Sequence, residues 1–89
     1  MTQPTTGETA RLDEAELRAL VADALELPVA DVTDDAEFVE ELGVDSLMIM
    51  EIMVRVEQRY GVQVEDEEFT DVRTFVHVRD LLAGKLAAA

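Results

Sequence analysis

Residues 42–60, LGVDSLMIMEIMVRVEQRY, decide how the rest of this chain is organised. The stretch predicts a short turn that leads into a helix over residues 46–60. Gly61 follows, a residue suited to the left-handed position after a helix end. Ser46 stands where the helix begins, and it is the only serine in the sequence. We expect any chemistry on this chain to take place at Ser46 and to be performed by other proteins.

Three further helical segments are predicted around this stretch. Asp13 with Glu16 resembles a capping box and opens a first helix, which Pro28 should end. Residues 66–69 predict one short helical turn, and Thr74 should cap a last helix over about residues 75–86. The connection over residues 28–45 is long, and we expect its apolar residues to hold it against the bundle: Val29, Val32, Phe38, Val39 and Leu42.

These segments predict an all-α fold. We expect a four-helix bundle of three longer helices and one short third helix, with a long loop between helices one and two. Val62 and Val64 alternate with polar residues, but a strand there would have no partner, so we expect none. The domain should span residues 11–86, between a flexible N-terminus at 1–10 and a flexible C-terminus at 87–89.

The composition excludes several classes of function. With a net charge of −14, the chain is a poor partner for nucleic acid or an anionic membrane surface. It has no cysteine, and the acidic runs at 31–37 and 65–68 lack the spacing of a dedicated cation site, so we expect no metal site. No apolar run would span a membrane and the N-terminus does not resemble a signal peptide, so we expect a cytoplasmic protein.

Ser46 allows two interpretations from its position. The first is a helix N-cap, which is the commoner use of serine there and the one that position alone favours. The second is an exposed attachment point for an anion such as a phosphodiester, which the helix N-terminus would stabilise. A catalytic nucleophile is disfavoured, because a serine nucleophile needs a neighbouring base. The only histidine, His77, is in the last helix and off its apolar stripe, which favours an exposed structural residue over a base. The segment GVDSL also lacks the second glycine of a G-x-S-x-G elbow. We predict no catalytic residue.

The helix over residues 46–60 carries apolar residues on two opposite faces. One face holds Leu47, Met50, Glu51, Val54 and Gln58, and the other holds Ile49, Ile52, Met53, Val56 and Tyr60. Periodicity alone allows either a helix buried on both sides or an exposed stripe for partners. Since a bundle with one very short helix would not bury both stripes, we assign the Ile49 face to the core. We predict that Leu47, Met50, Glu51 and Val54 bind partners.

Residues 38–47, FVEELGVDSL, followed by Met50-Glu51-Ile52, resemble the acyl carrier protein family. They match its phenylalanine, its Leu-Gly pair, its Asp-Ser-Leu triplet and the acidic–apolar pair that follows. Residues 60–62, YGV, and the acidic run at 66–68 resemble the aromatic-glycine-apolar segment and the acidic third helix of that family. The resemblance spans roughly residues 17–86.

The resemblance implies that Ser46 receives 4′-phosphopantetheine from coenzyme A, with Asp45 and Leu47 beside it in the binding site. A phosphopantetheinyl transferase adds the arm, whose thiol then carries acyl groups as thioesters. The chain would be a carrier and not an enzyme. Its other partners would be ketosynthase, acyltransferase and further synthase enzymes with basic docking surfaces, and the carrier itself would be a monomer. Because core residues such as Met53 are flexible, we expect the cargo to shelter between helices.

Two departures from the family pattern bear on the pathway. Met48 stands where many fatty-acid carriers have an acid, and Arg55 and Arg59 interrupt a helix that is often uniformly acidic. They favour polyketide or other specialised synthesis over fatty-acid synthesis. An aminoacyl- or peptidyl-type carrier is one alternative, although the Gly-Gly-x-Ser-like segment of peptidyl carriers is absent. A non-carrier acidic protein-interaction module is the alternative from another class.

Overall fold

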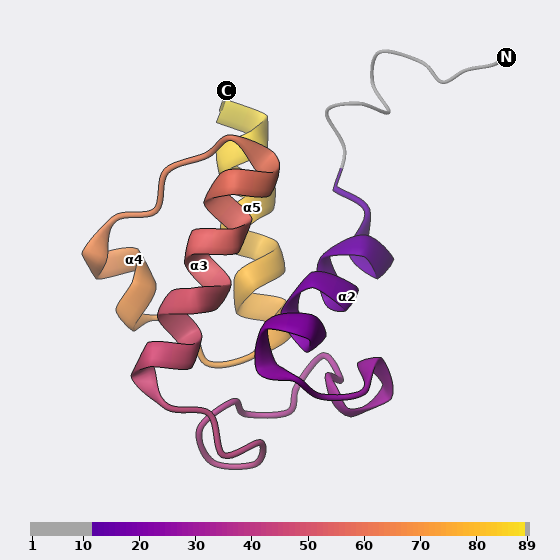
Figure 1. The fold of residues 1–89 in the computed structure, drawn as a ribbon. Helices are drawn as coiled ribbons and strands as arrows, with labels where there is room; N and C mark the ends of the chain where they lie inside the picture. The colour runs from indigo at the N-terminus through magenta and orange to yellow at the C-terminus, as the bar shows by residue number, and fades with distance from the viewer. Residues whose placement is uncertain (1–11, 89) are drawn as a thin grey trace, which may run out of the picture.

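The computed structural model describes residues 12–88, and all regular structure among them is helical (Figure 1). The elements in chain order are α2 (Glu14–Leu25), the short 3-10 turn η1 (Val29–Asp31), α3 (Ser46–Tyr60), α4 (Asp66–Thr70) and α5 (Phe75–Ala88). The predicted all-α fold with a short third helix is confirmed. The expected flexible segment at 1–10 lies outside the described residues, and α5 continues past the predicted helix end at Leu86.

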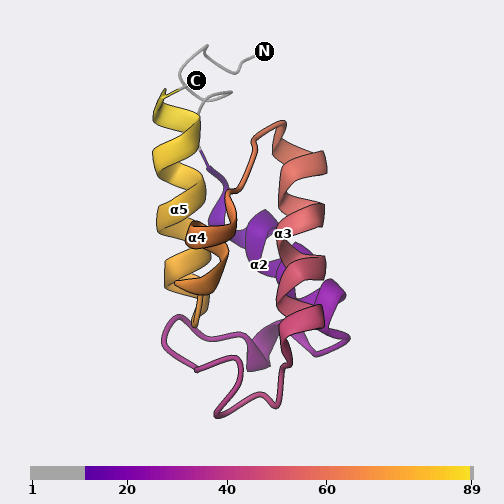
Figure 2. The same ribbon diagram turned by 90° about the vertical axis from the view of Figure 1, so that its left-hand side faces the viewer.

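The helices pack as a bundle with the long connection at one end. Figure 2 shows α4 between α3 and α5, and the α2–α3 connection at the end where α3 and α5 begin. This arrangement brings the start of α3 close to two irregular segments, the α2–α3 connection and the turn between α4 and α5. The surroundings of Ser46 are therefore built from parts of the chain that are far apart in sequence.

The first helix begins as predicted but ends earlier. The Asp13 carboxylate accepts hydrogen bonds from the N–H groups of Ala15 and Glu16, at 3.0 and 3.3 Å, which confirms the predicted helix start. At the other end Glu26 adopts a left-handed conformation with φ 58°, and the Leu27 N–H closes the last turn onto the Ala22 carbonyl at 2.9 Å. The prediction that Pro28 ends this helix was therefore wrong, because the backbone turns before the chain reaches the proline.

The short and last helices are capped by side chains. Glu65 and Glu68 form a capping box at the start of α4, in which the Glu65 N–H donates to Glu68 at 2.8 Å. This hydrogen bond, followed by the one from Lys85 on α5, lowers the pKa of the Glu68 carboxyl. The Thr74 hydroxyl accepts the His77 N–H at 3.3 Å, which confirms Thr74 as the cap of α5.

The core is a single cluster of aliphatic side chains that also contains two phenylalanines and a methionine. It draws on three helices and on the connecting segments: Leu17, Val21, Ala22 and Leu25 from α2, Ile49, Ile52, Met53 and Val56 from α3, Phe75, Val78 and Leu82 from α5, and Val32, Phe38, Val44 and Val72 from the loops. The face of α3 assigned to the core from the sequence is thus the buried one.

The long connection is held by fewer residues than predicted. Val32 and Phe38 are buried and Leu42 is half-buried, as expected. The prediction was wrong for Val29 and Val39, whose side chains are 49% and 57% exposed.

Hydrogen bonds explain why Phe38 points inward and its neighbour Val39 outward. The Phe38 N–H donates to the Arg73 carbonyl and the Phe38 carbonyl accepts the Val44 N–H, both at 2.8 Å. Val44 is buried as well, although the sequence reading did not include it in the core. These bonds fix the backbone of the connection against the turn before α5, and they leave Val39 outside the core.

Ion pairs connect the helices at the surface. Arg55 and Arg59 on α3 pair with Asp23 and Glu16 on α2, the first pair at 2.7 Å. Every basic residue between 12 and 88 takes part in an ion pair except Arg73. The remaining acids greatly outnumber these pairs, so the surface keeps most of its −14 net charge.

We expect this charge to limit stability. Repulsion among uncompensated carboxylates falls when salt screens them, and divalent cations screen more strongly. The melting temperature should therefore rise with added NaCl and rise further with Mg²⁺. A gain of about 1 kcal/mol would correspond to roughly 4–8 °C in a domain of this size. A melting temperature that both salts leave unchanged would contradict this prediction.

Candidate functional site

Ser46 is the first residue of α3 and is exposed. The N-cap is the preceding residue, Asp45, whose carboxylate accepts the Met48 N–H at 2.9 Å. The interpretation of Ser46 as the cap was therefore wrong. An N-cap residue has extended backbone angles, as Asp45 does with φ −98° and ψ 178°, whereas Ser46 already belongs to the helix. No side-chain hydrogen bond within residues 12–88 occupies the Ser46 hydroxyl.

The segment before Ser46 fixes its position. Gly43 has φ +69°, a left-handed conformation that glycine adopts without strain. Val44 follows and is buried, so the chain is anchored two residues before the serine. Asp45 follows at the surface, and α3 begins with the next residue. Because Val44 is anchored in the core, the Leu-Gly-Val-Asp sequence fixes the position of Ser46 at the surface.

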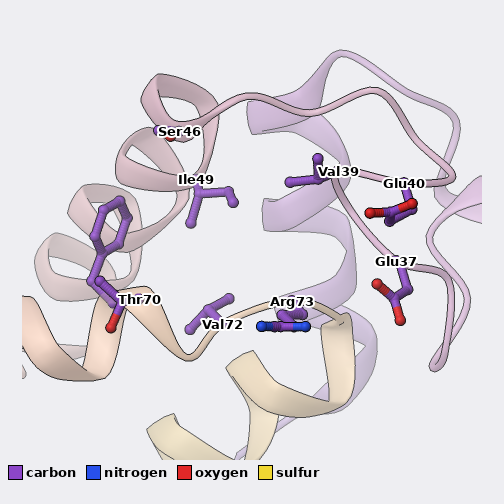
Figure 3. Close-up of a pocket in the computed structure, with 9 residues that line it drawn as sticks. Glu37, Val39, Glu40, Ser46, Ile49, Thr70, Val72 and Arg73 are labelled. Atoms are coloured by element: carbon purple, nitrogen blue, oxygen red, sulfur yellow. The ribbon is translucent and has the colours of Figure 1, made fainter.

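A cavity of about 420 Å³ lies beside Ser46 (Figure 3). Figure 3 shows that its walls come from α3, α4, the α2–α3 connection and the turn before α5. The lining residues are Glu37, Val39, Glu40, Ser46, Ile49, Phe69, Thr70, Val72 and Arg73. Ile49 and Val72 belong to the core cluster, so the cavity reaches from the exposed serine to the apolar interior.

Asp45 and Leu47 do not line this cavity. They line a shallower depression of about 320 Å³ between the end of α2 and the start of α3, together with Glu51 and Arg55. The structure therefore places the three residues predicted around the attachment point side by side but facing different surroundings. Ser46 faces the cavity, while its neighbours belong to the surface of α3.

The predicted partner-binding residues share one exposed face of α3. Leu47 is 74% exposed, Met50 49% and Val54 40%, and Glu51 is exposed among them. The prediction that this stripe is outside the core is confirmed. We call Leu47, Met50, Glu51 and Val54 the α3 docking face below.

The sequence reading missed that Glu51 is already paired. Arg55 Nε donates to Glu51 at 2.9 Å and Arg55 Nη1 donates to Asp23 on α2 at 2.7 Å. These hydrogen bonds, first from Glu51 and then from Asp23, raise the pKa of the Arg55 guanidinium. The spacing of four residues between Glu51 and Arg55 was an available signal for the first contact. The contact with α2 depends on the tertiary fold.

The histidine has a structural role at the start of α5. Its Nδ1 atom accepts the backbone N–H of Arg73 at 3.0 Å, and His77 does not line the cavity beside Ser46. In the part of the chain that the structure covers, no three potential ligands among histidine, aspartate and glutamate are placed to bind a metal ion. None of the helices described has the length and apolar character needed to cross a membrane.

The chain is similar in sequence to known proteins. The family model described as "Phosphopantetheine attachment site" matches residues 15–82. The chain is 52% identical over 78 residues to polyketide-8 synthase acyl carrier protein 2 of Streptomyces avermitilis, covering 88% of this chain and 90% of the relative. It is 36% identical over 72 residues to the acyl carrier protein of Thermosynechococcus vestitus, covering 81% and 89%.

Two solved structures have a similar fold. The actinorhodin holo acyl carrier protein of Streptomyces coelicolor superposes with a TM-score of 0.73 at 33% identity, covering 88% of this chain and 94% of that one. The 3,7-dioxo-octyl actinorhodin acyl carrier protein of the same organism superposes with a TM-score of 0.75 at 32% identity, covering 91% and 99%.

Proposed function

Because the chain belongs to the acyl carrier proteins, the family that carries 4′-phosphopantetheine, we propose that Ser46 is the residue to which this arm is attached. The chain is a carrier and not an enzyme. The observation that carries the assignment is the position of the only serine. It is exposed at the first residue of α3, directly after Asp45, and no hydrogen bond within residues 12–88 occupies its hydroxyl.

The residues around Ser46 fit a phosphodiester. The first N–H groups of a helix have no partner within the helix, and the helix dipole places partial positive charge at this end. Asp45 uses the Met48 N–H, but no acid lies in the first turn of α3 itself. Because position 48 is a methionine, no acid within that turn adds to the Asp45 carboxylate in offsetting the helix field.

The chain supplies position, and the arm supplies reactivity. When attached, the arm provides the thiol that forms thioesters, which this cysteine-free chain lacks. Asp45 fixes the first turn of α3 and thereby orients Ser46. Leu47 projects beside the serine, where the enzyme that modifies it must bind. We propose these roles for the two neighbours of Ser46.

The pathway we infer is polyketide or other specialised-metabolite synthesis. The support is the 52% identity to a carrier named for a polyketide synthase and the similarity to actinorhodin carrier structures. The paired arginines of α3 agree with this inference. The family match also favours a carrier over the non-carrier interaction module.

The partners of such a carrier are a phosphopantetheinyl transferase and synthase enzymes. We propose that ketosynthase, acyltransferase and related enzymes approach the α3 docking face with an apolar groove and a basic rim. Exposed apolar side chains surrounded by acids suit a partner of that composition. A monomeric, cytoplasmic carrier is part of the same proposal.

The docking face should contribute to modification and not to folding. Met50→Ala and Val54→Ala are expected to melt close to wild type, because both residues are exposed and lie outside the core cluster, and to slow arm transfer measured by intact mass. Ile52→Ala is the matched control on the buried face and should destabilise by about 2–5 kcal/mol. A loss of that size for Met50→Ala or Val54→Ala would show that these side chains belong to the core.

Changing the charge of the α3 docking face should either slow or speed arm transfer, depending on the sign of the change. Glu51→Arg removes the acid and places two arginines four residues apart, so arm transfer should slow and depend less on salt. Arg55→Ala releases Glu51 from its ion pair and should speed transfer at low salt. Rates would be measured with a basic transferase over a range of NaCl. Equal rates for both variants would contradict a role for Glu51 in docking.

A further inference from the structure

Arg73 differs from the other basic residues that the structure covers. Arg18, Arg55, Arg59, Arg79 and Lys85 each pair with a carboxylate, whereas Arg73 pairs with no carboxylate among residues 12–88. No hydrogen bond within residues 12–88 involves its guanidinium. Arg73 is exposed, so its guanidinium is open to solvent and accessible to a ligand.

The backbone of Arg73 is nevertheless fixed on both sides. Its N–H donates to His77 Nδ1 at 3.0 Å, and its carbonyl accepts the Phe38 N–H at 2.8 Å. Phe38 is fully buried, so this attachment ties Arg73 to the core. The backbone of Arg73 is therefore fixed, while no residue between 12 and 88 uses the hydrogen-bond donors of its side chain.

That side chain lines the cavity that Ser46 also lines (Figure 3). The cavity has an apolar part, formed by Ile49, Phe69 and Val72, and a charged part, formed by Arg73 with Glu37 and Glu40. Neither glutamate lies within 4.0 Å of the guanidinium as an ion pair. One cation and two carboxylates give this rim a net negative charge.

We propose that Arg73 is a specificity-determining residue, which makes the cavity beside Ser46 selective for acyl chains that carry ketone oxygens. The inference rests on the proposed attachment of the arm at Ser46. The apolar part of the cavity accepts the carbon chain, and the guanidinium donates hydrogen bonds to the ketone oxygens.

The composition of the rim discriminates among three kinds of cargo. A saturated chain gains only the apolar contacts and leaves the guanidinium to water. A chain that ends in a carboxylate is opposed by Glu37 and Glu40, because their like charges lie on the same rim. A neutral ketone accepts a charge-assisted hydrogen bond from Arg73 without that repulsion. Ketone-bearing chains are therefore the preferred class.

The test uses the full-length chain carrying the arm, loaded with amide-linked acyl groups that resist hydrolysis. Three cargoes of equal length would be compared: a saturated chain, a chain with ketones at alternate carbons, and a chain ending in a carboxylate. ¹H–¹⁵N spectra should show the ketone chain shifting the Ile49 and Val72 amides together with the Arg73 Nε–H resonance. The saturated chain should leave Arg73 unshifted, and the carboxylate chain should give the smallest changes.

Arg73→Met removes the donors and keeps the aliphatic stem, and both backbone hydrogen bonds of residue 73 remain available. The ratio of cavity-bound to free ketone chain should fall about fivefold, as expected for one lost hydrogen bond at an exposed rim. Arg73→Lys should lose less, because it keeps the charge. Arg79→Met is the matched control, since Arg79 does not line the cavity, and it should behave as wild type.

Two outcomes would overturn the proposal in distinguishable ways. If mass spectrometry shows the arm on Ser46 but Arg73→Met retains the full ketone preference, the role of Arg73 is wrong and the carrier assignment stands. If no arm is found on Ser46 after incubation with coenzyme A and a transferase, the attachment site and this inference both fail.

Discussion

Replacing Ser46 with alanine is expected to abolish addition of 4′-phosphopantetheine completely. The sequence contains no other serine, Ser46 is exposed, and its hydroxyl has no hydrogen-bond partner in the part of the chain that the structure describes. Incubation with coenzyme A and a promiscuous transferase, followed by intact mass measurement, checks this. An adduct on the alanine variant would show that the arm attaches elsewhere.

The same variant should fold almost normally. Ser46 is not the cap of α3, so its hydroxyl can be removed at a cost within about 0.5 kcal/mol, as for other exposed positions. Asp45→Ala is the matched control, because it removes the carboxylate that accepts the Met48 N–H. That variant should lose about 1 kcal/mol and be modified more slowly than wild type, because Asp45 orients Ser46, but modification should not be abolished. Destabilisation of Ser46→Ala by a comparable amount would contradict the assignment of the cap.

Phe38→Ala is expected to be the most destabilising single substitution in the connection, at about 3–5 kcal/mol. Phe38 is 0% exposed, and truncating a buried aromatic side chain leaves a cavity that the surroundings fill only in part. Small domains have only about 5–15 kcal/mol of total stability, so a large share would be lost. Urea unfolding followed by circular dichroism measures the difference.

Val39→Ala is the control for this substitution. Val39 follows Phe38 directly but is 57% exposed, so its truncation should change stability by less than about 0.5 kcal/mol. Similar losses for the two variants would mean that the connection does not hold Phe38 in the core. The Phe38 N–H is hydrogen-bonded to the carbonyl of Arg73, which lines the cavity. Loss of the Phe38 side chain should loosen this segment, so Phe38→Ala should also broaden the resonances around the cavity.

Hydrophobic periodicity was sufficient to predict α3. A helix repeats every 3.6 residues, so the alternation of two stripes was readable from the sequence, and the structure buries the stripe that begins at Ile49. The start of α3 was predicted at Ser46, but the cap was assigned to the wrong residue. Aspartate and serine are both good caps, and the choice between Asp45 and Ser46 depends on backbone angles that composition does not reveal.

The irregular segments were less predictable. Val29 and Val39 are as apolar as Val32, yet only Val32 is buried, because loops have no periodicity that assigns a side chain to one face. The cavity beside Ser46 was also beyond the sequence, since its lining comes from separate segments. For the same reason nothing in the sequence indicated a role for Arg73. That role follows from the fold, which places Arg73 and Ser46 on the same cavity.

The ion pair between Glu51 and Arg55 also affects how long an encounter lasts. A basic side chain of a partner enzyme must displace Arg55 from the Glu51 carboxylate. Arg55 remains nearby on the same helix and can rebind Glu51 as soon as the contact with the enzyme weakens. Exposed ion pairs of this kind are worth about 0–1 kcal/mol, which corresponds to at most roughly a fivefold change in dissociation rate. A tethered competitor therefore shortens residence on every partner alike, and short residence allows one carrier to serve several enzymes in succession.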